Sequence, residues 1–219
     1  MDKAATTSLG PGTRGLLAII LLGAGASLYF AVSAAFSDAA SLQARWQISQ
    51  WQADERLKPK PAELGRVRND LLAALRWTPG DPQIHESLGY LSGVRAAGAR
   101  AIPELEQAML EESIADYRTA ITLRPMSAYA WANLALAMHL KGGEQEALWA
   151  AYDHAYLYGN RETGVQRILA EVGFSHWDEA GAERQGQLVH MIDIAYPHAR
   201  GDLTRIAGKY HKESLLAKP

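Results

Sequence analysis

The sequence contains no cysteine and carries almost no net charge. The lack of cysteine excludes disulfide bonds, a thiol nucleophile and a cysteine-ligated metal, so core packing alone must hold the fold together. The 22 Lys and Arg residues nearly balance the 24 Asp and Glu residues, which gives a formal charge of −2 at pH 7. Nucleic-acid recognition needs a basic surface, and this balance therefore argues against a nucleic-acid partner.

The motifs of common enzyme classes are missing as well. No two of the seven histidines have the spacing of the zinc-protease helix, and the sequence has no nucleophile elbow, phosphate-binding loop or dinucleotide-binding turn. Glu104 and Glu106 belong to a helix that looks solvated, and a histidine such as His190 is more often packed or at the surface than a ligand. We therefore expect no enzyme activity, with no catalytic residues, no cofactor and no metal site.

One stretch of the chain lacks charge altogether. Gly15–Phe36 is a run of twenty-two residues without Asp, Glu, Lys or Arg. About 20 apolar residues in a helix, each rising about 1.5 Å, cross a hydrocarbon core of roughly 30 Å. Tyr29, Phe30 and Phe36 suit the interface between membrane and water. We therefore expect a transmembrane helix over residues 15–37.

The charges that flank this stretch predict its orientation. Lys3 and Arg14 precede it, Asp38 follows it, and the next basic residue is Arg45. By the positive-inside tendency, the N-terminal tail stays in the cytoplasm and the larger domain lies across the membrane. In a Gram-negative cell this predicts a single-pass protein of the inner membrane with a periplasmic C-terminal domain. The alternative is a cleaved secretory signal ending at the small residues 33–35, although a signal's apolar region runs only about 7 to 15 residues.

The rest of the chain has helical periodicity and no convincing strand. Good helix formers dominate, and β-branched residues in period-two alternation are missing. The membrane helix can continue outward from Ala39 to about Arg56, before Lys58–Pro61 breaks it. The fold class is predicted to be all-α. Recurring Pro, Gly and Asn breakers delimit helices expected near residues 62–77, 82–96, 103–123, 127–140, 143–158, 161–173, 178–195 and 199–217.

The spacing of these helices resembles the tetratricopeptide (TPR) repeat, a helix pair of about 34 residues that closes with proline. If Pro125 closes one repeat, Tyr117 takes its large aromatic position and Ala120 its small position. The next repeat then starts at Ala128. Its matching residues are Trp131, Leu134, Ala135, Gly142 and Ala147.

Further copies match less completely. One begins at Asp81, with Leu88 and Gly89 on the Leu-Gly pair, but about ten extra residues near 93–103 must loop out or lengthen its helices. Leu71, Ala74 and Pro79 resemble the second helix of a partial repeat upstream, and Val165, Ile168 and Leu169 resemble a first helix downstream. The expected organisation is a cytoplasmic tail, a transmembrane helix, a juxtamembrane helix with linker, TPR-like repeats and C-terminal capping helices, over residues 1–14, 15–37, 38–61, 62–177 and 178–219.

In a helical solenoid the binding surface is usually the concave face, which is built from the first helix of each pair. By repeat phase, we expect a partner-binding groove formed by Tyr90, Tyr129, Asn133, Leu136, His139 and Arg167.

Some TPR domains clamp a partner's terminal carboxylate with Lys, Asn and Arg side chains from successive repeats. Here only Asn133 and Arg167 fall on such positions, whereas Glu86, Tyr90 and Thr163 replace the others. Glu86 would repel a carboxylate, so the resemblance implies a polar and aromatic groove without that clamp.

A second resemblance concerns the whole chain. A short tail, one span, a Trp-containing stalk and a degenerate TPR domain are similar to small accessory proteins of bacterial exopolysaccharide biosynthesis, the VpsP type. The similarity to these accessory proteins is most evident in residues 74–91, ALRWTPGDPQIHESLGYL. The resemblance implies a scaffold beside a polysaccharide polymerase or export complex.

Three functions remain open from the sequence. The favoured one is a membrane-anchored adaptor whose groove holds a membrane or periplasmic protein of an envelope polysaccharide assembly. The second is a module that binds the polysaccharide itself, for which several exposed aromatics would have to line the groove. The third is an adaptor for another envelope process, such as cytochrome maturation or secretion.

Overall fold

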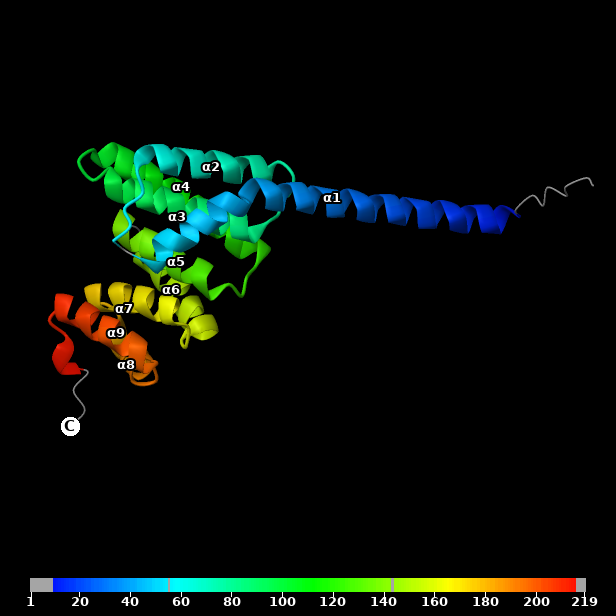
Figure 1. Ribbon diagram of the computed structural model, residues 1–219. Coiled ribbons are helices and arrows are strands. Elements are labelled where there is room, and N and C mark those ends of the chain that lie inside the picture. The colour runs from blue at the N-terminus through cyan, green and yellow to red at the C-terminus, as the bar shows by residue number, and fades with distance from the viewer. Residues whose placement is uncertain (1–9, 55, 143, 216–219) are drawn as a thin grey trace, which may run out of the picture.

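The structure is a computed structural model that describes residues 10–54, 56–142 and 144–215. These residues are all-α, as predicted, and include no strand. The described residues form nine α-helices and a short 3₁₀ helix (Figure 1). Lys3, most of the tail 1–14, Gly143 and the end of the expected helix 199–217 lie outside the described residues. The elements are α1 Pro11–Ala53, α2 Pro61–Leu75, α3 Pro82–Gly98, α4 Pro103–Leu123, α5 Ala128–Lys141, α6 Gln145–Gly159, α7 Thr163–Ser175, α8 Gly181–Asp193, α9 Pro197–Lys209 and η1 Glu213–Leu215.

The bounds of the helices follow from their terminal residues. Proline opens four helices after α1, at Pro61, Pro82, Pro103 and Pro197, where its missing N–H costs no hydrogen bond. Gly142 closes α5 in the left-handed conformation, with φ of 72°, which glycine adopts without steric cost. The expected helices between residues 62 and 173 therefore lie within a few residues of the observed ones.

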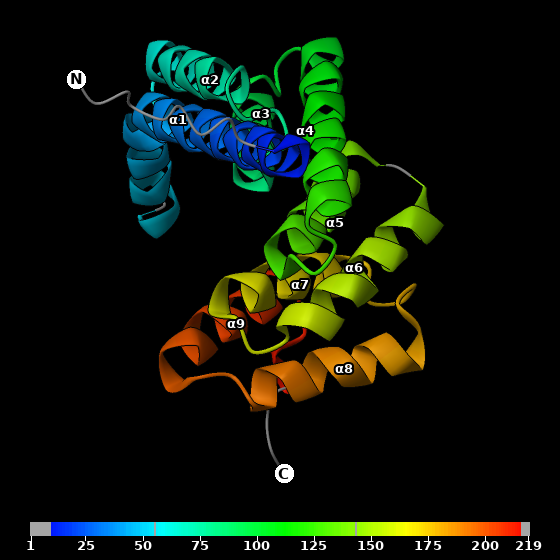
Figure 2. The ribbon, with the colours of Figure 1, turned by 90° about the vertical axis from the view of Figure 1, so that its right-hand side faces the viewer.

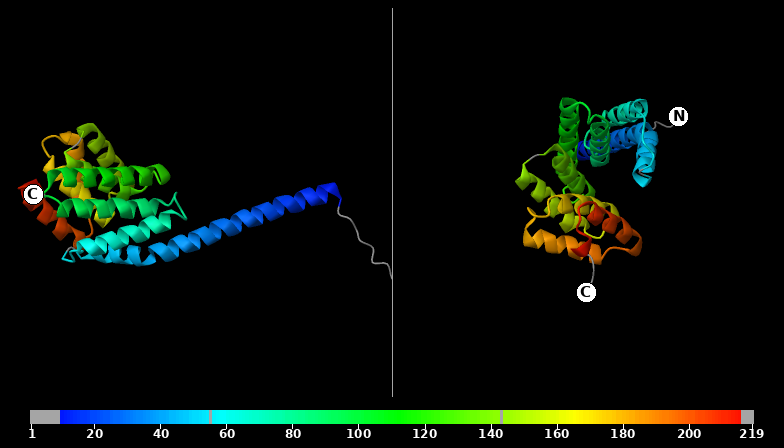
Figure 3. Two further views of the ribbon diagram at one scale, coloured as in Figure 1. Left: turned by 90° about the horizontal axis from the view of Figure 1, so that it is seen from above. Right: turned by 90° about the vertical axis from the view of Figure 1, so that its left-hand side faces the viewer.

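Helix α1 is the longest element, with 43 residues. Its N-terminal half stands away from the other helices, and its C-terminal half lies against α2 and α3 (Figures 1 and 3). By length and composition it is the one helix in the described residues that could cross a membrane, and none of its most apolar window is buried. The helix continues past Ala39 to Ala53, as the sequence predicted.

The remaining helices stack as hairpins. Helix α1 packs on α2, α3 on α4 and α5 on α6, while α4 also contacts α5 and α7 contacts α5, α8 and α9. Figure 2 views this stack from the side on which α1 leaves it, with α2 to α4 at one end and α8 and α9 at the other. The first helices of successive pairs, α1, α3, α5 and α7, thereby come to face a common space.

The end of α1 belongs to this packed body. Ala44 and Ile48 are buried in a cluster with Leu64, Leu71 and Ile84 from α2 and α3. Residues 38–61 were expected to be a juxtamembrane helix and linker outside the repeats. In the structure the last turns of α1 pack on α2 as a helical hairpin, while the bounds of the domains stay a prediction. The described residues between the two helices, Asp54 and 56–60, contain no α-helix.

Candidate functional site

The concave side of the stack holds a groove of about 770 Å³. We call it the concave groove, and its walls come from α1, α3, α5 and α7, with single residues from α4 and α9. Five of the six side chains predicted to form a binding surface line it. They are Tyr90, Tyr129, Asn133, Leu136 and Arg167.

His139, the sixth predicted residue, is not among the residues that line the concave groove. Its Nδ1 lies 2.9 Å from Nε2 of His176, whose Nδ1 in turn lies 2.8 Å from a carboxylate oxygen of Glu179. Burial lowers the pKa of His139, and the neighbouring His176 lowers it further, while Glu171 acts in the opposite direction. The structure therefore places His139 in a packed histidine pair.

The α1 wall of the concave groove was not predicted from the sequence. This wall consists of Arg45, Ile48, Ser49, Trp51 and Gln52. The sequence does contain a signal that this part of α1 packs against other helices. Ser37, Ser41, Ala44 and Ile48 recur every three or four residues, which marks one helix face, and all four are buried. Small polar residues on that face do not stand out as a core, because hydrophobicity alone does not mark them.

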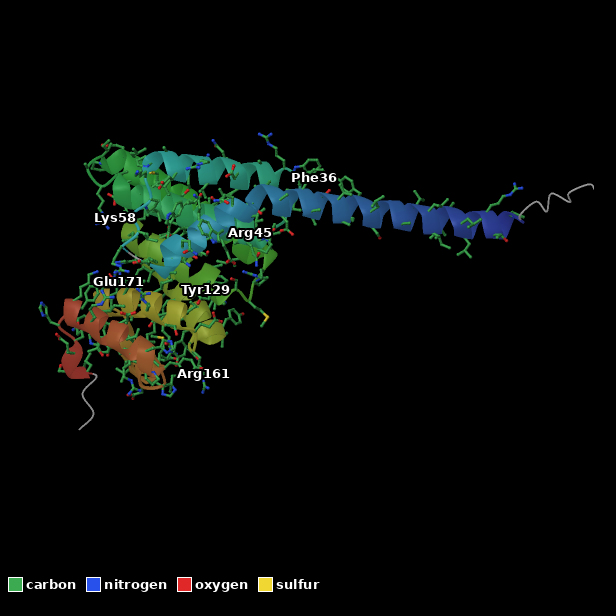
Figure 4. All side chains as sticks on the ribbon, viewed as in Figure 1. Phe36, Arg45, Lys58, Tyr129, Arg161 and Glu171 are labelled. Atoms are coloured by element: carbon green, nitrogen blue, oxygen red, sulfur yellow. The ribbon has the colours of Figure 1, made fainter. Side chains whose placement is uncertain are left out.

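Tyr129 lines the concave groove from the first turn of α5. Figure 4 labels it together with Arg45 of α1 and Glu171 of α7, which line the same groove. Its side chain is 43% exposed, and a Cβ added to Gly164 would lie 2.8 Å from its hydroxyl oxygen. Glycine at position 164 is thus what lets the Tyr129 ring lie against α7. Partial burial raises the pKa of Tyr129, and the charge of Glu162 raises it further, so the hydroxyl stays protonated at neutral pH.

The charged residues of the concave groove are engaged in ion pairs. Arg124 lies 2.6 Å from Glu86, and the Ser127 hydroxyl donates to the same carboxylate at 2.8 Å. Arg45 pairs with Asp38 at 2.7 Å, outside the groove. Such pairs neutralise the charge of each side chain toward a ligand.

The charged residues on the α7 side of the groove also form ion pairs. The Tyr210 hydroxyl donates to Glu171 at 2.6 Å, and Lys209 forms an ion pair with the same carboxylate. Burial raises the pKa of Glu171, but the hydrogen bonds from Lys209 and Tyr210 outweigh burial and lower it overall. Arg167 Nε lies 3.7 Å from Asp202. The groove is therefore polar and aromatic with balanced charge, which suits a protein segment or a sugar more than a polyanion.

Asn133 and Arg167, the two residues on carboxylate-clamp positions, do line the same groove. Asn133 donates its side-chain amide to the Tyr129 carbonyl at 2.8 Å, which orients it along α5. Glu86 of α3 also lines the groove and is paired with Arg124. The groove thus has two of the side chains that such a clamp uses. It also has the Glu86 carboxylate, which would repel the C-terminal carboxylate of a partner.

Groups with catalytic or metal-binding potential have structural partners. No cluster of three or more His, Asp or Glu side chains suited to a metal ion occurs in the described parts of the chain. Arg184 donates to both carboxylate oxygens of Asp153 at 2.8 Å, and the His154 ring stacks on Trp131 at 4.4 Å. These contacts join α8 to α6 and α6 to α5.

A second cavity, of about 1020 Å³, lies between the end of α1 and helices α2 to α4. Among the described residues, the charged side chains that line it are all basic: Lys58, Arg68, Arg95 and Arg100. Trp51 and Tyr90 line both cavities and so form the wall between them. We place the candidate site in the concave groove, because it gathers side chains from four successive first helices.

The packing at the repeat positions points to the family. Tyr117 is buried, and a Cβ on Gly89 would lie 3.0 Å from its ring, so this glycine permits the close approach of α3 and α4. Trp131 donates its indole N–H to the Pro125 carbonyl at 2.7 Å, which joins the closing proline to the next helix. Residues 105–142 match the family model of the TPR repeat. This match covers most of α4 and all of α5, and together with the all-helical fold it supports a TPR protein. No curated protein and no solved structure matches the chain.

Proposed function

We propose that the protein is a membrane-tethered TPR adaptor that binds a segment of a partner protein in its concave groove. TPR repeats are protein-interaction modules, so the repeat match supports a protein partner. The observation that carries the proposal is the groove itself, which joins three repeat helices to the end of the apolar helix α1. Tethering raises the effective concentration of the groove near other membrane proteins, so modest affinity suffices.

We further propose that the partner belongs to an envelope assembly and that the protein lies in the inner membrane with the repeats outside the cytoplasm. The uncharged run of α1 supports the anchor, and the flanking charges support the orientation. The likeness of residues 74–91 to exopolysaccharide accessory proteins supports a polymerase or export subunit as the partner. The anchor, the orientation and the pathway are separate proposals, and each can fail without the others.

Site-specific photo-cross-linking in cells tests the adaptor function. A photoreactive amino acid is placed at Asn133 in the groove and, as a matched control, at exposed Thr119 on α4. We expect one membrane or periplasmic protein to be linked from position 133 and not from 119. Tyr129→Ala should weaken that partner's binding by roughly 30-fold, or about 2 kcal/mol, as expected for a central aromatic contact. Identical adducts from both positions, or none from 133, would contradict groove binding.

One observation favours a second function, binding of the polysaccharide itself. Trp51 and Tyr117 join Tyr90 and Tyr129 in the lining of the concave groove, so four aromatic side chains line it where the sequence predicted two. Aromatic faces commonly support sugar rings by stacking. Saturable quenching of Trp51 emission by the purified cell-surface polysaccharide, lost in Trp51→Phe, would support this function over the adaptor.

A further inference from the structure

The end of the uncharged run is fixed to the repeats by two contacts. The Phe36 ring stacks on Trp77 of the α2–α3 turn, with centroids 4.7 Å apart and planes 18° apart. One residue further, the Ser37 and Thr78 hydroxyl oxygens lie 2.5 Å apart. Because α1 is unbroken through this point, the α2–α3 turn lies level with the residue at which the apolar segment ends. Figure 4 shows Phe36 where α1 leaves the stack.

Both rings remain largely in solvent. Phe36 is 53% exposed and Trp77 is 46% exposed, and Arg76 beside Trp77 is exposed too. Tryptophan concentrates at the interface between lipid and water, where its ring is in the headgroup region, and arginine extends its charged end from there into water. A scattered exposed aromatic needs no explanation, but two stacked rings at the end of an uncharged helix do.

The neighbouring turn adds apolar surface on the same side. The α4–α5 turn projects toward the side on which α1 leaves, as does the α2–α3 turn (Figure 1). Leu123 and Met126 there are 42% and 73% exposed. The two turns adjoin, since a Cβ on Gly80 would lie 3.9 Å from Leu123 Cδ2. We call Phe36, Trp77, Leu123 and Met126 the apolar rim.

We propose that the apolar rim rests in the lipid interface of the membrane that α1 crosses, so that the repeats touch the bilayer at a second point, around Trp77. This inference rests on the proposed membrane anchor. A lipid surface fits better than a protein partner, because α1 itself sets the rim at the level of the membrane–water boundary. The contact fixes both the height and the rotation of the repeats above the membrane.

Fluorescence quenching in nanodiscs tests the contact. The full-length chain is reconstituted in lipids brominated on the upper part of the acyl chain, and emission is compared with that in unbrominated lipids. The signal of Trp77 is the difference between the unsubstituted protein and Trp77→Phe, a change that retains an aromatic ring against Phe36. We expect most of the Trp77 emission to be quenched.

Trp46 supplies the matched control. It is 57% exposed on α1, ten residues beyond Phe36, which places it about 15 Å further from the boundary. The Trp46→Phe difference signal should be unchanged by brominated lipid. If brominated lipid quenches the Trp77 and Trp46 signals equally, or does not quench the Trp77 signal, the rim does not contact the lipid.

Alkaline carbonate extraction separates failure of the anchor from failure of the rim. A chain that leaves the membrane in carbonate has no span, and both proposals then fall. A chain that stays embedded while Trp77 remains unquenched retains its anchor, and only the rim contact is refuted. Thermal unfolding of Trp77→Phe, monitored by circular dichroism, shows that the repeats are still folded in the tested variant.

Discussion

At the scale of residues, glycine positions decide how closely the helices pack. The sequence pattern assigned Gly89 to the Leu-Gly pair of a repeat, and the structure gives the reason in its contact with the Tyr117 ring. Tyr117, Leu134 and Ala135 were predicted as packing positions, and all three are buried. The repeat pattern therefore predicts the residues that pack between neighbouring helices, because the repeat is defined by that packing.

The helix crossing at Gly159 should tolerate no side chain. A Cβ there would overlap the Cβ of Ala128, which the backbone of α5 holds in place. Gly159→Ala should lower the free energy of unfolding by about 2 kcal/mol through overpacking. Gly65→Ala is the matched control, because no heavy atom lies within 4 Å of its added Cβ, and it should be neutral or stabilising. Urea denaturation measures both, and an equal effect would refute the argument.

The histidine pair predicts a pH dependence of stability. The pKa of His139 is lowered in the folded state, so the unfolded chain binds a proton more readily than the folded one. Its contribution is favourable above the unfolded value of about 6.5 and is lost as the pH falls through the lower folded pKa. The urea midpoint should therefore drop between pH 7.5 and 5.5, and by less in His139→Gln. The exposed His198→Gln should keep the dependence of the unsubstituted protein.

At the scale of elements, proline and glycine breakers were sufficient to predict the helices, but not their partners. The extra residues near 93–103 lengthen α3 to Gly98 and move the start of α4 to Pro103. This irregular repeat therefore accommodates them mainly by longer helices. The role of α1 was harder to predict. Its buried face consists of Ser33, Ser37, Ser41 and Ala44 beside Ile48. Three of these residues are serines, and a polar side chain does not indicate a packed face by its hydrophobicity.

The packing of α1 sets where the folded domain begins. A fragment of residues 37–219 should unfold cooperatively, whereas 62–219 lacks the helix that covers Leu64 and Leu71 and should show a much lower Tm or aggregate. Within 37–219, Ile48→Ala should cost about 2 to 4 kcal/mol by leaving a cavity, and exposed Gln50→Ala almost nothing. Differential scanning calorimetry compares the four proteins. Equal Tm values for the two fragments would show that α1 contributes nothing to the core.

At the scale of the whole molecule, the concave groove was predictable in part. Repeat phase brings Tyr90, Tyr129, Asn133, Leu136 and Arg167 to one face, because successive first helices lie side by side in any such stack. Repeat phase also predicted His139 on this face. In the structure His139 instead contacts the ring of His176 at the end of α7. Contacts that cross between repeats depend on the rotation of one helix pair against the next, and a repeat pattern does not contain that rotation.

The continuity of α1 also has a consequence for how a signal or a force would pass through the molecule. A helix turns by about 100° per residue, so Arg45, Ile48 and Gln52 keep a constant angular phase relative to every residue of the uncharged run. No hinge lies between the two parts. A protein that rotates the uncharged run of α1 would therefore transmit this rotation to the α1 wall of the concave groove and, through the packing of α1 on α2 and α3, to the repeats. The uncharged run and the α1 wall of the groove thus move as one rigid element.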